Sequence, residues 1–149
     1  MRIKKPSPLH LDQQLCFALY TASRLMIQNY TPLLKELDLT YPQYLVMLVL
    51  WKDDQLSVKD IGLQLKLDSG TLSPLLKKLQ TKGLLKKIRS TRDERSVAIA
   101  LTEKGIHIKK IAEKIPTAMF CKLSMKEKDF AAIRNSLQNL ILHLETIAI

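Results

Sequence analysis

Two cysteines lie far apart in this 149-residue chain, and the first, Cys16, stands where a thiol could react. Asp12 precedes it by four residues and is a suitable helix N-cap, which predicts that Cys16 lies in the first turns of a helix. The helix dipole favours a negatively charged thiolate at that end. A thiolate attacks a peroxide to give a sulfenic acid, which then condenses with a second thiol. Cys121 supplies the other thiol of the chain.

An inert, buried cysteine is the alternative for Cys16, because free cysteine is often a small hydrophobic residue of a core. Composition alone favours this alternative. Cys121 by itself is equally compatible with a resolving thiol and with a packing residue. The three histidines, His10, His107 and His143, are scattered, and with two distant cysteines they form no metal-ligand pattern. We therefore expect no metal and no cofactor.

The segment from Asp68 to Arg95 has features of a site for an acidic polymer. Asp68 is a good N-cap, leucines recur behind it at helical spacing, and Gly83 ends the helix. Pro74 either removes one hydrogen bond inside this helix or marks a start one or two residues later. The stretches 84–88 and 97–101 flank a polar tip and predict a hairpin. The segment from Pro74 to Arg95 contains eight basic and two acidic residues, so its formal charge is 8 − 2 = +6. This is more than half of the chain's formal net charge of +10.

A helix with small polar residues, followed by a basic hairpin, suits duplex DNA. A helix fits the major groove, where base edges present distinct donors and acceptors. Arginine at a hairpin tip fits a narrow minor groove of negative potential. A solvated basic helix and an ordinary surface hairpin are the alternative. The order of short helix, turn, capped helix and basic hairpin is typical of a winged helix-turn-helix and weighs against that alternative.

The predicted DNA contacts fall into three groups. The residues expected on the floor of the groove are Thr71, Ser73 and Lys77, with Ser69 on the same polar side. Those expected at phosphates are Lys78, Lys86, Lys87, Arg89 and Arg92. Arg95 is expected in the minor groove, oriented by Asp93.

Composition bounds the class of protein. A hydrophobic content of 46% indicates a folded chain, and the length is that of one domain. Few prolines and glycines, together with helical periodicity, favour a mainly α fold with a small β-hairpin. The positive charge favours nucleic acid or an anionic membrane as partner. The longest apolar run, 44–51, is far shorter than the ~20 residues of a bilayer span. We expect a cytoplasmic protein with reduced thiols and no membrane partner.

Helices are expected at both ends of the chain. The first runs from Asp12 to about Tyr30, where Pro32 interrupts or restarts it. The helix after the hairpin is capped by Thr102 and runs to about Lys114. A capping box at Ser124 opens the last helix.

The middle of the chain has its own start signals. A capping box at Thr40 opens an apolar core helix over 42–52, and Ser57 starts a short helix through Leu65. The end helices have apolar stripes with little of this middle unit left to cover, so pairing with a second copy is expected. We assign about 10–38 and 103–149 to dimerisation and about 40–101 to DNA binding. We call the helix between Asp68 and Gly83 the reading helix, because it is the one expected in the major groove. A two-fold dimer would place its two copies ~34 Å apart.

The chain resembles the MarR family of transcription regulators. The pattern Asp93-Glu94-Arg95, with Leu101-Thr102 just beyond, is typical of the family's wing. A narrower resemblance, to its organic hydroperoxide repressors of the OhrR type, rests on residues 11–20 (LDQQLCFALY), 39–44 (LTYPQY) and 67–77 (LDSGTLSPLLK). These blocks keep the family's order and spacing across most of the chain, and the block around Cys16 is the most specific.

The resemblance implies a homodimeric repressor whose operator is released when an organic hydroperoxide oxidises Cys16. It implies that tyrosines hydrogen-bond the thiolate; Tyr20, Tyr30 and Tyr41 match tyrosines of one or another subtype. Cys121 matches a second cysteine that, in some members, forms a disulfide with the reactive cysteine of the other subunit. Similar proteins also include broader stress and virulence regulators.

Spacing restricts which tyrosine can reach Cys16. Tyr20 follows it by four residues and is a neighbour on the same helical face. Tyr30 follows by fourteen residues and lies about 21 Å further along a straight helix. A bond between Cys16 and Tyr30 therefore needs two antiparallel copies. Tyrosines at helical spacing are also common as core or interface residues with a bonded hydroxyl.

Two other functions remain open. One is a MarR-like regulator that binds a small phenolic or other anion in the dimer cleft, with no role for Cys16. The other is an enzyme, a thiol peroxidase, which would turn over repeatedly with a reductant. The basic hairpin has no role in such an enzyme, so we expect a regulator.

Overall fold

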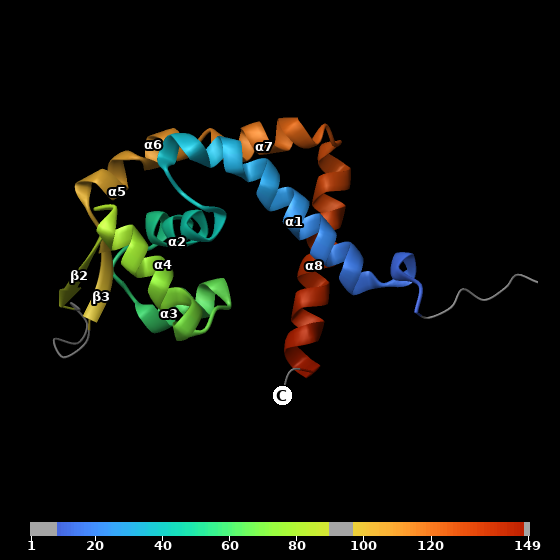
Figure 1. The fold of residues 1–149 in the computed structure, drawn as a ribbon, viewed down its shortest axis with the longest axis horizontal. Helices are drawn as coiled ribbons and strands as arrows, with labels where there is room; N and C mark the ends of the chain where they lie inside the picture. The colour runs from blue at the N-terminus through green and yellow to red at the C-terminus, as the bar shows by residue number, and fades with distance from the viewer. Residues whose placement is uncertain (1–8, 90–96, 148–149) are drawn as a thin grey trace, which may run out of the picture. The chain divides into compact units, whose positions relative to one another are not determined.

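The computed structural model describes residues 9–89 and 97–147 as mostly helical with one small sheet (Figure 1). The helices are α1 (Leu15–Leu34), α2 (Tyr41–Lys52), α3 (Val58–Leu65), α4 (Ser69–Thr81), α5 (Glu103–His107), α6 (Lys109–Ala112), α7 (Ile115–Leu123) and α8 (Glu127–Ile147). Short 3-10 turns cover Leu11–Gln13 and Lys35–Leu37. The predicted mainly α fold with a small hairpin is confirmed. Contacts divide the chain into two compact units, one ending at Ile115 and the other starting at Pro116.

The sheet is antiparallel, with strand order β1-β3-β2. Its strands are β1 (Leu56–Ser57), β2 (Leu85–Arg89) and β3 (Val97–Leu101). Leu85 pairs with Leu101 and Arg89 with Val97, so β2 and β3 form the predicted hairpin. β1 pairs with the outer edge of β3 through Leu56 and Ile99. The hairpin is therefore joined to the segment that starts α3.

Side-chain caps start both helices of the helix-turn-helix, as predicted. The Ser57 hydroxyl accepts the Asp60 N–H at 3.0 Å, and Asp68 Oδ1 accepts the Thr71 N–H at 2.8 Å. Gly83 has a φ of +72°, which suits the glycine that ends α4. Because Asp68 is the cap, a later helix start is wrong. Pro74 lies inside α4 and leaves the Gly70 carbonyl without its helical donor.

The core belongs to the first unit and joins α2, α4 and the hairpin. Tyr44, Met47 and Leu50 of α2 are buried, as the apolar pattern of that helix predicts. Leu72 and Leu79 of α4 pack in the same cluster. The strands and the segments beside them contribute Leu84, Leu85, Ile99 and Leu101. The β2–β3 hairpin is the wing. Since α2, the reading helix α4 and the wing share one closely packed core, a shift in one of them displaces the others.

Two expectations for the start of the chain are wrong. Asp12 lies inside the 3-10 turn, where its carboxylate accepts Gln13 Nε2 at 3.2 Å, so it cannot take the extended backbone of an N-cap. Gln14 occupies the N-cap position, which makes Cys16 the second residue of α1. Pro32 does not interrupt the helix, which continues to Leu34, because a proline near a helix end costs only a single backbone hydrogen bond.

The segment after the wing also differs from expectation. Thr102 caps α5 as predicted, accepting the Gly105 N–H at 3.1 Å, but the expected single helix is divided at Ile108 into α5 and α6. Ser124 does not open the last helix. Its φ is +51° and its hydroxyl donates to the Cys121 carbonyl at 3.4 Å, so it ends α7 instead. α8 begins three residues later, at Glu127.

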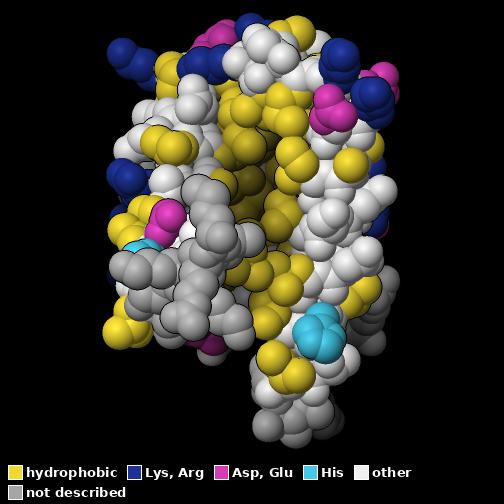
Figure 2. Space-filling model, turned by 90° about the vertical axis from the view of Figure 1, so that its right-hand side faces the viewer, with side chains coloured by type: hydrophobic (Ala, Val, Ile, Leu, Met, Phe, Trp, Pro, Cys, Tyr) yellow, Lys and Arg dark blue, Asp and Glu magenta, His cyan; other side chains and the backbone are white. Residues whose placement is uncertain are grey.

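The two long helices expose their apolar side chains. In α1 only Leu34 is buried, and no residue of α8, Glu127–Ile147, is buried in the single chain. Hydrophobic side chains are exposed on the face shown in Figure 2, which includes α8. Across residues 9–89 and 97–147, no helix is long and apolar enough to cross a membrane. These apolar faces are suited to another protein surface.

Candidate functional site

Both thiols are accessible in the chain. Cys16 and Cys121 are free and exposed. The core of the single chain therefore does not bury Cys16. As the second residue of α1, Cys16 lies beside the unpaired N–H groups and positive dipole end of a helix of 20 residues. Cys121 lies in the last turn of α7, in the other compact unit.

The predicted tyrosines divide into two groups. Tyr20 lies one turn beyond Cys16 on α1 and is 66% exposed. Tyr30 and Tyr41 contact each other with their rings tilted by 48° and the ring centroids 4.7 Å apart. Tyr44 completes a tyrosine cluster with Tyr30 and Tyr41, at 6.1 Å and 6.4 Å respectively. Tyr44 is not among the residues predicted from the sequence, although its place one turn after Tyr41 on an N-capped helix could have indicated it.

Burial sets the protonation of the tyrosine cluster. It raises the pKa of Tyr44 to about 12, with the neighbouring Tyr30 and Tyr41 adding to the effect. Burial also raises the pKa of Tyr41, and burial followed by the neighbouring Tyr41 raises the pKa of Tyr30. All three rings therefore keep their hydroxyl protons at neutral pH. A protonated phenol can donate a hydrogen bond to a thiolate.

The tyrosine cluster cannot serve Cys16 of the same chain. Cys16 and Tyr30 lie on one continuous helix, fourteen residues apart. At 1.5 Å per residue, their backbones are separated by about 21 Å along the axis. A bond between Cys16 and Tyr30 therefore needs two copies of the chain.

The predicted DNA-binding residues that are described all lie on the surface of α4 or β2. The exposed ones are Ser69, Thr71, Ser73, Lys77, Lys78, Lys86, Lys87 and Arg89. The Thr71 hydroxyl is oriented by donating to Asp68 Oδ2 at 2.8 Å. Hydrogen bonds from the Thr71 backbone N–H and then from its hydroxyl lower the pKa of the Asp68 carboxyl. Arg92, Asp93 and Arg95 lie outside the described residues.

The reading helix and the wing enclose an open cavity of about 350 Å³. Ser73, Lys77 and Gln80 of α4 line one side, and Lys87 of β2 lines the other. Two cationic side chains thus face a concave surface between two elements, a shape and charge that fit a sugar–phosphate strand. Gln80 was missed in the sequence, where it reads as an ordinary polar helix residue. Among the described residues no group of three side chains could hold a metal ion.

Comparisons with known proteins agree with this arrangement. A family model described as "Transcriptional regulator SarA/Rot" matches residues 28–112. The organic hydroperoxide resistance transcriptional regulator of Bacillus subtilis is 45% identical over 133 residues, which cover 89% of this chain and 90% of the relative. The described helix-turn-helix and the tyrosine cluster both fall within the range that the family model matches.

Two solved structures of one protein are informative, since they differ in state. The protein is AbfR, of Staphylococcus epidermidis. Reduced AbfR bound to DNA is 34% identical, with a TM-score of 0.73 over 90% of this chain and 93% of that chain. The structure described as disulfide-formed AbfR is 36% identical, with a TM-score of 0.62 over 88% and 92% of the two chains.

Proposed function

Because this chain belongs to the MarR family of winged-helix transcription regulators, in its SarA/Rot-type group, we propose that it is a homodimeric, DNA-binding repressor inactivated by organic hydroperoxides. One observation carries the redox part of the proposal. Cys16 is exposed at the start of α1, and the far end of the same helix contributes Tyr30 to a tyrosine cluster that Cys16 of the same chain cannot reach. Residues 10–38 and 103–149 would then serve dimerisation.

Operator binding is assigned to α4 and the wing. The N-terminal half of α4 presents small polar side chains on its exposed side, as a helix in a major groove needs. Lys77 and Lys87 line the cavity from its two sides, so both would face a DNA phosphate strand lying in it. The DNA-bound structure of reduced AbfR, at 34% identity, supports carrying this role to the present chain. Arg92 and Arg95 would extend the contact at the hairpin tip.

The redox step has two bond exchanges. The Cys16 thiolate attacks the outer oxygen of the hydroperoxide, and the O–O bond breaks to give Cys16 sulfenic acid and an alkoxide, which takes up a proton to leave as an alcohol. Cys121 of the second copy then attacks the sulfenic sulfur, forming a disulfide and releasing water. The partner's tyrosine cluster donates hydrogen bonds that hold Cys16 as thiolate before the reaction. The disulfide-formed structure of AbfR supports this second step.

Formation of that disulfide would force a movement wherever Cys16 and Cys121 of the second copy start further apart than a disulfide allows. A disulfide needs Cα atoms within about 7 Å of each other. Cys121 lies on α7, which follows α5 and α6 directly, and these follow the wing. Drawing α7 toward another chain would disturb the two-fold spacing of the reading helices, so the operator would be released.

Salt dependence tests the proposed phosphate contacts. We expect Lys87→Ala to make the plot of log affinity against log salt shallower by roughly 0.9 for each phosphate that the protein no longer neutralises, and a dimer has two such lysines. The control is Lys110→Ala, which removes an exposed lysine of α6 and should leave the slope unchanged. Fluorescence anisotropy with labelled operator at several salt concentrations gives both slopes. An unchanged slope for Lys87→Ala would remove that lysine from the interface.

Covalent linkage tests the role of Cys121. After treatment with cumene hydroperoxide, the wild-type protein should run as a covalent dimer on a non-reducing gel, and Cys121→Ser should run as a monomer. The reason is that the sulfenic acid of Cys16 then has no second protein thiol to condense with. Reduction with dithiothreitol should return the wild-type dimer to monomer. A covalent dimer that persists in Cys121→Ser would point to a bond between two copies of Cys16.

A gel shift with the DNA upstream of the gene that encodes this protein tests the function as a whole. We expect the reduced protein to retard this DNA and cumene hydroperoxide to abolish the shift. A small phenolic acid, tested in parallel with alkylated protein, separates peroxide sensing from ligand sensing. Release by the phenolic acid but not by the hydroperoxide would favour the ligand-binding alternative.

A further inference from the structure

Aromatic side chains extend the tyrosine cluster along α2 to the other end of that helix. Tyr41 and Tyr44 lie near its start, and Trp51 lies in its last turn. The rings of Tyr44 and Trp51 are 6.2 Å apart and meet edge to face. Tyr30, Tyr41, Tyr44 and Trp51 therefore form an unbroken series of ring contacts, here called the aromatic ladder. Such side chains are stiff and pack closely, so a displacement at one end is passed on.

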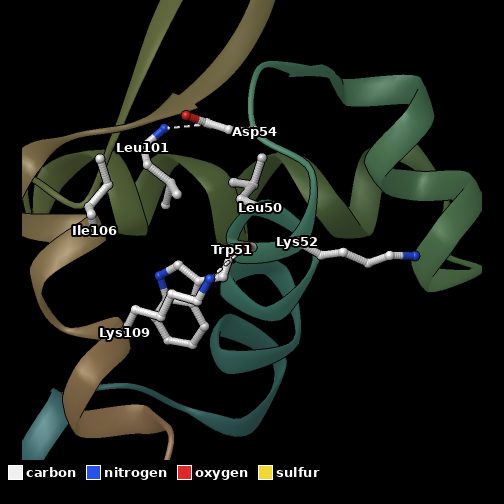
Figure 3. A pocket seen from close by; sticks show the side chains of 7 residues that line it. All are labelled: Leu50, Trp51, Lys52, Asp54, Leu101, Ile106 and Lys109. Atoms are coloured by element: carbon white, nitrogen blue, oxygen red, sulfur yellow. Dashed lines mark hydrogen bonds between the residues drawn. The ribbon is translucent and has the colours of Figure 1, made fainter.

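Hydrogen bonds tie the Trp51 end of the ladder to the segment that follows the wing. The indole Nε1 donates to the Gly105 carbonyl of α5 at 2.8 Å. Lys109 Nζ of α6 donates to the Trp51 carbonyl at 2.9 Å (Figure 3). Just beyond α2, Asp54 Oδ1 accepts the backbone N–H of Leu101, the last residue of β3, at 2.9 Å. These bonds join elements about fifty residues apart in sequence.

The start of α5 in turn holds the base of the wing and the end of the reading helix. Thr102 donates its hydroxyl to the Gly83 carbonyl at 2.6 Å and its N–H to the Leu84 carbonyl at 3.0 Å. Gly105 approaches the same segment so closely that an added Cβ would lie 2.3 Å from the Leu84 oxygen. Lys104 Nζ donates to the Lys82 carbonyl at the C-cap of α4, at 2.8 Å. A shift of Gly105 therefore moves the junction between α4 and β2.

We propose that Trp51 is the positioning residue through which the tyrosine cluster sets the placement of the reading helix and wing. This inference rests on the proposed function, because it needs Tyr30 and Tyr41 to respond to the thiol of a second copy. When that thiol is oxidised and drawn away, the ladder relaxes, and the indole N–H carries the change to Gly105. The junction of α4 and β2 then moves with α5. Trp51 itself contacts neither DNA nor peroxide.

The surroundings of Trp51 leave space for such a change. An open cavity of about 260 Å³ lies beside the indole, between the end of α2, the end of β3 and α5 (Figure 3). Its apolar lining comes from Leu50, Leu101 and Ile106. The indole therefore has open space on one side into which it can tilt, while its hydrogen bond to Gly105 holds it in the arrangement of this structure. Two arrangements of one packed element are what coupling between distant sites requires.

Trp51 is the single tryptophan of the chain, so its fluorescence reports directly on this position. We expect the emission of the full-length wild-type dimer to change when about one equivalent of cumene hydroperoxide is added per Cys16, and to return with dithiothreitol. Cys16→Ser should show no change at the same dose, which excludes direct oxidation of the indole. Unchanged emission in a wild-type protein that has been oxidised and has released its operator would overturn the inference.

A substitution measures the coupling itself. Trp51→Phe keeps a smaller aromatic ring on the ladder and removes the donor to Gly105. We expect its reduced form to bind operator within about threefold of wild type, while the ratio of oxidised to reduced Kd falls from about tenfold or more to below about threefold. The matched control is Leu48→Ala, on the exposed side of α2, which should keep the wild-type ratio. A purely structural role would weaken reduced and oxidised binding alike.

The outcomes separate this inference from the function on which it rests. If wild-type protein does not release DNA although mass spectrometry shows Cys16 oxidised, the proposed function and the inference both fail. If wild type releases DNA and Trp51→Phe releases it to the same extent, only the inference fails. Should Trp51→Phe not fold by circular dichroism, the emission change of the wild type decides alone.

Discussion

We expect Cys16→Ser to bind operator DNA as the wild type does and to remain bound at a hydroperoxide dose that releases the wild type completely. Serine keeps the size and polarity of the side chain, and the position is exposed, so stability should change by no more than about 0.5 kcal/mol. The serine hydroxyl stays protonated at neutral pH and does not attack a peroxide. The reactive group is thus removed without disturbing α4 or the wing, which lie in a core that Cys16 does not enter.

The measurement is a titration of preformed protein–operator complex with cumene hydroperoxide, followed by anisotropy. Cys121→Ser and wild type are titrated in parallel, and mass spectrometry confirms which thiol has gained oxygen. Release of the Cys16→Ser complex at the wild-type dose would rule out Cys16 as the sensor. In that case the alternative regulator, which binds a small anion and does not use the thiol, would be preferred.

The same titration answers the enzymatic alternative. A sensor consumes one equivalent of hydroperoxide per Cys16 and then stops, since its disulfide has no reductant in the assay. Both proteins can be re-reduced when a thiol reductant is supplied, so a parallel assay with reductant compares rates, and sustained steady-state consumption of many equivalents per Cys16 would favour a thiol peroxidase. Relatives that cover about nine-tenths of this chain are described as transcriptional regulators, which gives family-level support to the first outcome.

The helix-turn-helix and wing were predictable because their signals are local. Asp68 caps α4 through a bond to a residue three positions away, and Gly83 ends it through its own backbone conformation. The wrong predictions of helix starts fall at residues whose side chains can serve more than one local structure. Asp12 and Ser124 both have the chemistry of an N-cap, but one lies within a 3-10 turn and the other ends the preceding helix. Only the path of the backbone decides between these uses.

The candidate site was predictable in part. Cys16, Tyr30 and Tyr41 were identified from a family pattern, and the fourteen-residue spacing already indicated that a second copy is needed. Tyr44 and Trp51 were not identified as site residues, because a helix that is apolar nearly all round hides which face its aromatic residues share. The bond from Trp51 to Gly105 spans 54 residues and has no local signal at all. Contacts of that kind come from packing.

The apolar stripe of α8 gives the second large expected effect, because operator binding by the proposed repressor depends on the proposed dimer. Ile133, Leu137 and Ile141 recur every four residues, and their side chains are 51%, 39% and 42% exposed in the single chain. We expect the double variant Leu137→Glu/Ile141→Glu to be monomeric, since two unpaired carboxylates cannot be buried in an apolar interface at acceptable cost. Operator affinity should then fall by about two to four orders of magnitude, because each reading helix loses the effective concentration that its partner provides.

Sedimentation velocity measures the oligomeric state, and anisotropy on the full operator measures the affinity. The matched control is Asn135→Glu, which adds a carboxylate to an exposed position of α8 about 200° around the helix from Leu137 and should leave both measurements unchanged. Circular dichroism checks that the double variant keeps its helices, as expected from a core that lies between residues 34 and 115. A double variant that remains dimeric would place the interface elsewhere. It would also remove the second copy that the pairing of Cys16 with Tyr30 and Tyr41 requires.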